Sequence, residues 1–286
     1  MLKIAFLTTK RVFQFIIIMS ITKALNACEE QWIKALSNLT SEQVLNLYYQ
    51  SALYNTVSDA KLRILEEHKL FNPNFYHAQW PVVKTHLDEA VLSNRMAVFE
   101  RLLDAGASIY LPKVHTTCCY EQVGDTMPCI GKLICYPKKV SMPFIKKLVE
   151  RNQYFIHTKI DSLTEITPLH IAVRYARYAY VDYFLAMHAH WNTMNHKKQT
   201  PLHYALTHIK YCDDTHYTIM WYNKTEKKIP YTRLCAIIAL LKKYGALLCQ
   251  AEWKLIKEKF GSNALVYKEL MRAAGKEGDS YPCQLL

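Results

Sequence analysis

Residues 167–172 read TPLHIA, and residues 200–205, one 33-residue period later, read TPLHYA. The threonine suits the N-cap of a short helix, and the proline fits the first turn because it has no N–H to leave unbonded. The leucine and the alanine fall on one side of that helix. Self-similarity at a period of about 20–50 residues indicates stacked units, each too small to bury its apolar face alone.

The period and the T-P-L-H-x-A pattern resemble those of the ankyrin repeat. The resemblance implies an all-α fold: an ankyrin-repeat solenoid of helix-turn-helix units with short hairpin loops and helical caps. In that family the histidine of the pattern hydrogen-bonds across neighbouring turns, so we expect His170 and His203 to be scaffold residues. The function that the resemblance implies is protein binding without catalysis.

Weaker copies of the pattern lie on both sides of these two. The apolar spacing of the second helix, seen at 180–185, recurs at 98–103, 144–149 and 237–241. Within a repeat region at 80–250 we therefore expect four repeats, at residues 85–117, 126–158, 167–199 and 200–249. An N-terminal helical cap is expected at 28–79, where Thr40 and Gln43 fit a capping box, and a C-terminal helical cap and tail at 251–286.

Three features depart from the family pattern. His188 stands where the family prefers glycine, which weakens the expected helix C-cap, and Asn152 occupies the corresponding slot of the preceding repeat. A Tyr-rich, polar insertion at 209–232 is too long for an ordinary helix–helix connection, which is usually under about 8 residues. Within it, Trp221 and Tyr222 either cover the stack or contact a partner.

In an ankyrin stack the variable residues of the first helices and the hairpins form a concave binding face. Carried over position by position, the candidate partner-binding residues are Ile171, Arg174, Tyr175, Lys197, Gln199, Tyr204, Thr207, His208, Trp221 and Tyr222. Because Arg and Tyr are enriched at interface centres, a basic and aromatic strip suits an acidic protein partner. The competing interpretation is that these are ordinary solvated residues.

Composition narrows the function classes. The chain has 286 residues, 51% of them hydrophobic, and a mean hydropathy of −0.09, so we expect a sizeable core and no integral membrane span. The net charge of +12 would attract anions, but the excess is spread thinly along the chain, which disfavours nucleic acid as a partner.

No catalytic residue, cofactor or metal is expected from the motifs. The sequence has no Gly-rich phosphate loop and no H-E-x-x-H or G-x-S-x-G motif. A cysteine cluster at residues 118, 119, 129 and 135 lacks the C-x-x-C spacing that is usual for zinc. Cys212 and His216 lie close in sequence, which alone does not create catalytic geometry. An enzyme whose active site involves the unassigned N-terminal region stays as an alternative.

Residues 1–27 have two interpretations. Lys10 and Arg11 precede a short apolar run, as in a signal or lipoprotein segment; alternatively, the true start is Met19 and the preceding residues are a mis-assigned start. The odd count of nine cysteines favours reduced thiols and a cytoplasmic location, which includes the cytoplasm of a host cell.

The balance of 27 Lys to 9 Arg is typical of AT-rich genomes. Intracellular bacteria and large viruses both use ankyrin proteins to engage host proteins, so the resemblance implies an effector in host interaction. An endogenous cytoplasmic adaptor is the alternative.

Overall fold

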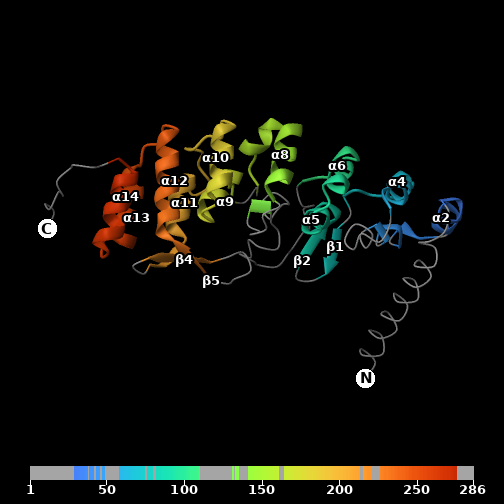
Figure 1. The fold of residues 1–286 in the computed structure, drawn as a ribbon, viewed down its shortest axis with the longest axis horizontal. Coiled ribbons are helices and arrows are strands. Elements are labelled where there is room, and N and C mark those ends of the chain that lie inside the picture. The colour runs from blue at the N-terminus through green and yellow to red at the C-terminus, as the bar shows by residue number, and fades with distance from the viewer. Residues whose placement is uncertain are drawn as a thin grey trace, which may run out of the picture. The chain divides into compact units, whose positions relative to one another are not determined.

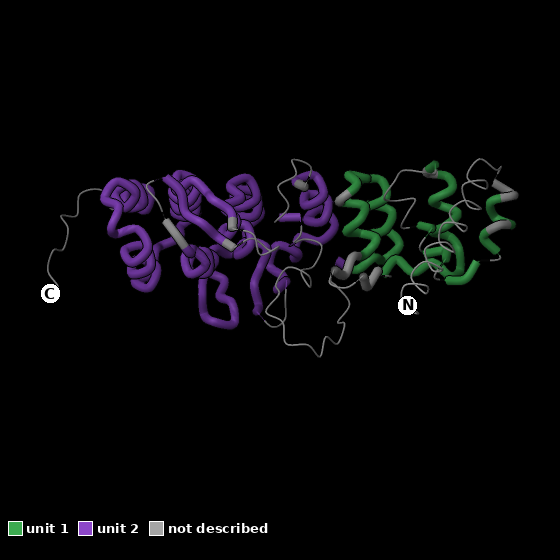
Figure 2. The backbone as a smooth tube through the Cα atoms, turned by 90° about the horizontal axis from the view of Figure 1, so that it is seen from below, with its two compact units in different colours: residues 1–79, 84–108 green, residues 80–83, 109–286 purple. Residues whose placement is uncertain are grey.

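A computed structural model describes residues 29–37, 39–41, 43–45, 47–48, 58–74, 76–79, 82–109, 131, 133–134, 141–160, 164–212, 215–220 and 226–275 (Figure 1). Contacts divide the chain into two compact units, residues 1–79 with 84–108 and residues 80–83 with 109–286 (Figure 2). The expected targeting segment and the cysteine cluster at 118–135 lie outside the described residues.

The first unit contains α2 (Glu29–Leu36), α4 (Asp59–Glu67), α5 (His86–Leu92) and α6 (Met96–Asp104). Strands β1 (Tyr76–Gln79) and β2 (Val82–Thr85) form a two-stranded sheet just before α5. The predicted capping box is confirmed: the Thr40 N–H donates to Gln43 Oε1 at 2.9 Å, and the Gln43 N–H donates to Thr40 Oγ1 at 3.3 Å. A second box opens α5, where Thr85 and Asp88 bond each other's backbone N–H groups.

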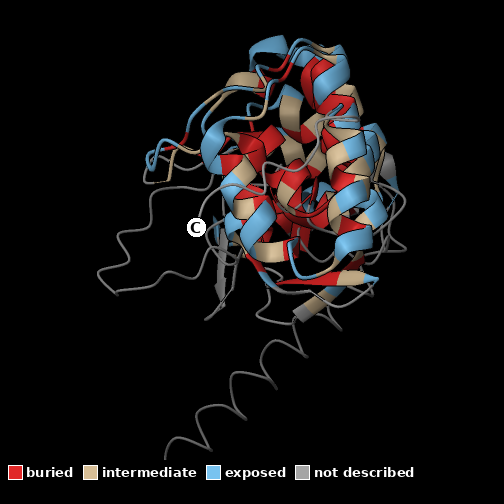
Figure 3. Ribbon diagram, turned by 90° about the vertical axis from the view of Figure 1, so that its left-hand side faces the viewer, coloured by how far each residue is buried: buried red, intermediate tan, exposed pale blue. Residues whose placement is uncertain are grey.

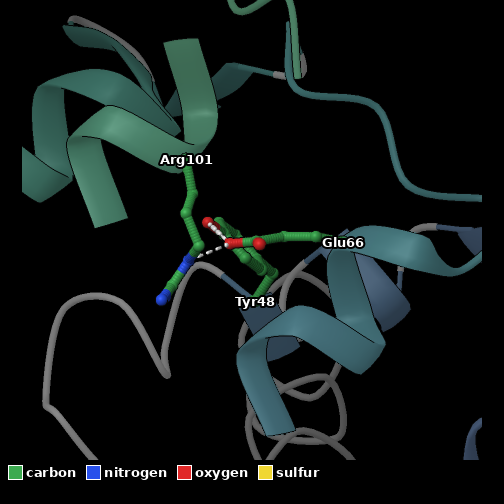
Figure 4. A network of polar contacts seen from close by, with 3 residues as sticks. All are labelled: Tyr48, Glu66 and Arg101. Carbon is green, nitrogen blue, oxygen red and sulfur yellow. Dashed lines mark hydrogen bonds and ion pairs between the residues drawn. The ribbon is translucent and has the colours of Figure 1, made fainter. Parts of the chain in front are cut away.

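A polar network joins α4 to α6 inside this unit (Figure 4). Glu66 Oε1 accepts hydrogen bonds from Tyr48 Oη at 2.7 Å and from Arg101 Nε at 3.1 Å. Burial and the neighbouring Glu66 carboxylate raise the pKa of Tyr48 far above its ordinary value, so the phenol stays protonated and remains a donor. The Glu66 carboxylate therefore links α4 to α6 at a site that is largely excluded from water.

The second unit is a stack of helix pairs. Its elements are α8 (Ser141–Arg151), η1 (Gln153–His157), α9 (Pro168–Arg174), α10 (Tyr178–Ala186), α11 (Pro201–Thr207), α12 (Tyr231–Lys243), α13 (Gln250–Phe260) and α14 (Ala264–Ala273). The first helices pack in the order α9, α11, α13, and the second helices in the order α10, α12, α14. The C-terminal helices thus continue the stack as another pair.

Five helices end in the same hydrogen-bonded motif. After α5, α6, α9, α10 and α12, one residue takes a positive φ, and the next N–H bonds the carbonyl five residues before it, at 2.8–3.0 Å. These positive-φ residues are Asn94, Gly106, Ala176, His188 and Gly245. His188 therefore does form the C-cap that its side chain was expected to weaken, with φ 65°. Asn152 differs: its φ is −148°, and its side chain accepts from the Tyr154 N–H to start η1.

The insertion folds as an antiparallel sheet of three consecutive strands, which the sequence analysis did not anticipate. The strands are β3 (Ile209–Cys212), β4 (His216–Met220) and β5 (Glu226–Pro230), in the order β3-β4-β5. Tyr217 pairs with Ile229, and Ile219 pairs with Ile209, so buried apolar side chains share one face. Along β5 the buried Ile229 follows the exposed Lys228, whereas in β4 Thr218 is buried together with Tyr217 and Ile219.

Burial follows the repeated apolar spacing (Figure 3). The second-helix residues of α10 and α12 that were expected to pack inward are buried, including Val181, Phe184, Ile237 and Leu241, as are Leu133 and Phe144 in the degenerate repeat. Each fully buried aliphatic or aromatic side chain stabilises the fold by about 1.5–3 kcal/mol. Within the described part of the chain, no helix combines the length and apolarity needed to cross a membrane.

Candidate binding surface

The hairpin between α10 and α11 is organised by one buried amide. Asn195 Oδ1 accepts from the N–H groups of Lys197 and Gln199, each at 3.0 Å, and its Nδ2 donates to Gln199 Oε1 at 3.1 Å. Lys198, with φ 55°, completes the tight turn. These bonds fix the backbone that carries Lys197 and Gln199.

His170 ties this hairpin to the preceding helix. Its Nε2–H donates to the Gln199 carbonyl at 3.1 Å, and its Nδ1 accepts from the Thr167 N–H at 3.2 Å. Burial lowers the pKa of His170 to about 4, with the bond to Gln199 opposing that shift, so the ring is neutral near pH 7. The expected scaffold role of His170 is therefore confirmed by its bonds.

His203 does not have the same role. Its ring has no hydrogen bond to the described residues; instead, Thr200 Oγ1 donates to Glu252 Oε1 of α13, and the Cys249 N–H donates to Glu252 Oε2 at 2.8 Å. Only 3 residues lie between Gly245 and Cys249, against 11 between His188 and Thr200. The connection from α12 to α13 is thus too short to form a hairpin with a backbone carbonyl that could bond His203, as the Gln199 carbonyl bonds His170. Glu252 instead links the α11–α12 pair to the α13–α14 pair.

Arg174 is held between two tyrosines beside the hairpin. Its Nη1 donates to Tyr204 Oη at 2.9 Å, and its guanidinium carbon lies 5.3 Å from the Tyr175 ring centre and 5.5 Å from that of Tyr204. Cation–π contact and the hydrogen bond restrict a side chain that is otherwise rich in rotamers. A positive charge is therefore presented in a fixed position.

His208 extends the cluster along α11. Its ring contacts that of Tyr204 in a tilted arrangement, with centres 4.3 Å apart and an interplanar angle of 54°, and its Nδ1 bonds the Tyr204 carbonyl at 2.7 Å. Burial first, and then the positive charge of Arg174, lower the pKa of His208 to about 4; Lys197 acts in the same direction. The imidazole of His208 is therefore neutral near pH 7 and lies close to the positive charges of Arg174 and Lys197.

The structure brings together most of the candidate residues of the repeat stack. Lys197 and Thr207 are exposed, and Arg174, Gln199 and His208 are partly exposed. We call these five residues, together with Tyr204, the basic–aromatic cluster. Trp221 and Tyr222 lie outside the described residues.

Ile171 and Tyr175 are not surface residues, which corrects their assignment as direct contacts. Ile171 is 1% exposed and Tyr175 is 3% exposed, and Tyr204, at 8%, is also buried. The helix α9 has only seven residues and packs against η1, α10 and α11, so six of the seven are buried. The Tyr175 ring contacts the guanidinium of Arg174.

Asn195 and Glu252 are the structural residues that the sequence analysis did not identify. An asparagine two residues before a Lys-Lys pair is a turn signal that could have indicated the first. Nothing local to Glu252 predicts its bond to Thr200, which spans 52 residues. Among the described residues, no group of three or more His, Cys, Asp or Glu side chains converges as a metal site.

The comparison with protein-family models supports the repeat assignment. The ankyrin repeat family model matches residues 164–193. The crystal structure of the human ASB11 ankyrin repeat domain aligns with a TM-score of 0.49 and 20% identity, over 80% of this chain and 82% of that one. No curated protein sequence matches the chain.

The matched segment contains α9, α10 and the His170 linkage, and the same packing continues through the pairs α11–α12 and α13–α14. The 33-residue period, the capped first helices and the shared helix-end motif agree with one architecture. The chain therefore contains an ankyrin repeat at residues 164–193, within a stack of similar helix pairs.

Proposed function

We propose that this protein is a non-catalytic protein-interaction module that binds an acidic segment of its partner at the basic–aromatic cluster. Ankyrin repeats generally mediate protein–protein interactions. The observation that carries the proposal is the fixed guanidinium of Arg174, held 2.9 Å from Tyr204 Oη beside the ordered turn that carries Lys197. A preorganised cation loses less conformational entropy on binding a carboxylate than a mobile one.

The positive charges of the basic–aromatic cluster support an acidic occupant. The Arg174 guanidinium can donate a hydrogen bond to a carboxylate, while Lys197 contributes a second positive charge and Gln199 a neutral amide. Tyr204 and His208 supply apolar ring surface next to these polar groups. An acidic segment with an apolar or aromatic residue beside its carboxylate matches this arrangement.

The test is a binding assay with defined peptides. Fluorescence anisotropy would compare an acidic-aromatic peptide library with its Asn/Gln-substituted counterpart on the wild type and on Lys197→Glu. We expect charge reversal to weaken selected acidic peptides at least tenfold and to reduce the dependence of affinity on salt. Lys268→Glu on α14, an exposed lysine far along the chain, is the matched control and should leave affinity within twofold. Equal losses in both variants, or no acidic preference, would refute the proposal.

The origin of the partner is a second question. We favour a host protein, as for an effector, on the strength of the Lys-rich composition, and an endogenous adaptor is the competing proposal. A Lys197→Cys variant labelled with a photoreactive group would be crosslinked in host cytosol and in the cytosol of the producing organism. The result would distinguish a host-directed effector from an endogenous adaptor. A specific adduct in only the cytosol of the producing organism would favour the adaptor.

A further inference from the structure

Two histidines from successive repeats meet at the surface of the second unit. His157 ends η1, and His190 follows the C-cap of α10; they are 33 residues apart, one repeat period. Their ring centres are 4.9 Å apart with an interplanar angle of 37°. His157 is partly exposed and His190 is exposed, so solvent and small ions reach the pair.

The geometry suits two imidazoles that share one metal ion. With a metal–nitrogen distance of 2.0–2.1 Å and about 1.1 Å from nitrogen to ring centre, two ligands at a tetrahedral angle have ring centres about 5.2 Å apart. At the 90° angle of an octahedral site the separation is about 4.5 Å. The observed 4.9 Å lies between these values.

The ring nitrogens are available for coordination. No hydrogen bond joins either imidazole ring to the residues that the structure describes; the bond at His190 is to its backbone carbonyl, which accepts from Thr193 Oγ1. His157 is the last residue of η1, and His190 lies four residues after the end of α10, so both positions belong to the repeat stack.

We infer that His157 and His190 form a two-histidine clamp for a divalent transition-metal ion of the Zn²⁺ or Ni²⁺ class, which bridges neighbouring repeats. Imidazole suits these borderline ions and not Mg²⁺ or Ca²⁺, which prefer oxygen ligands. Water completes the coordination, because two protein ligands leave positions open. A bound ion stabilises the contact between the repeats that supply its two ligands.

The test uses Ni²⁺, which binds imidazole and broadens nearby NMR signals. The full chain, labelled with ¹⁵N in histidine, is titrated with Ni²⁺ at pH 7.5, and calorimetry gives the affinity. We expect broadening first at the His157 and His190 rings, and at least tenfold weaker binding in either His157→Asn or His190→Asn. Ni²⁺ should raise the melting temperature of the wild type more than that of either variant, and Mg²⁺ should not raise it.

His188→Asn is the matched control, since it removes an exposed imidazole only two residues from His190. It should leave Ni²⁺ affinity within twofold, while circular dichroism confirms that all the variants are folded. Lowering the pH should also weaken Ni²⁺ binding, because metal binding requires unprotonated imidazole rings. The inference is overturned if only one of the pair matters, if neither does, or if broadening starts at other histidines.

Discussion

Replacing His188 with glycine should stabilise the second unit, although it removes a side chain. His188 has φ 65° at the end of α10, where its N–H and that of Ala189 close the helix against Leu185 and Phe184. A residue with a Cβ costs roughly 1–2 kcal/mol in the left-handed region. Glycine removes that cost but loses about 0.5–1 kcal/mol through its freer unfolded state.

The net expectation for His188→Gly is a gain of about 0.5–1 kcal/mol, or about 2 °C in melting temperature. Because the His188 side chain is exposed, little packing is lost to offset this gain. Urea denaturation and differential scanning calorimetry at pH 7.5 would measure both quantities.

Two controls isolate the backbone as the cause. His188→Ala keeps a Cβ at the same positive φ, so its stability should stay within about 0.5 kcal/mol of the wild type. Gly245→Ala tests the converse: Gly245 has φ 90°, and a Cβ there would meet no atom within 4 Å, so a loss of about 1 kcal/mol would come from the backbone alone. If His188→Ala gained as much as His188→Gly, the imidazole rather than the backbone would be responsible, and the reasoning would fail.

Two further predictions concern buried polar groups. The folded pKa of about 4 for His170 lies below the unfolded value of 6.5, so the stability that its neutral ring contributes is complete above pH 6.5 and is lost as the pH falls toward 4. Chemical denaturation should therefore show about 2 kcal/mol less stability at pH 5 than at pH 7.5 from this residue. His170→Gln should weaken this dependence of stability on pH. Glu66→Ala should destabilise the first unit by about 3 kcal/mol, because Tyr48 and Arg101 lose a shared acceptor at a site only 12–17% exposed. Glu66→Gln retains an acceptor and should cost less, as hydrogen exchange or urea unfolding would report; equal losses would contradict the assigned role.

Local chemistry is enough to predict the repeat core. The Thr-Pro pairs cap and start α9 and α11, and the apolar pairs at 184–185 and 237–238 are buried. These outcomes depend on helix periodicity and on contacts that every unit makes with its neighbours, so the sequence pattern carries them.

The candidate site was only partly predictable. Arg174, Lys197 and His208 were assigned by their position in the repeat, and the structure brings them together. Whether a residue of a first helix faces solvent, however, depends on how closely the next helix pair packs against it. Ile171 and Tyr175 are buried because α9 packs on three sides, which no local pattern encodes.

The sequence by itself determined the 33-residue period, the helix starts and the apolar seams, because each depends on residues within one repeat or on its neighbour. Only the tertiary structure decided that Glu252 replaces His203 as the link to the next pair, that the insertion forms a three-stranded sheet, and that Arg174 is fixed between two rings. These features join residues up to 52 positions apart, and their free energy depends on distances that are set when the helix pairs stack.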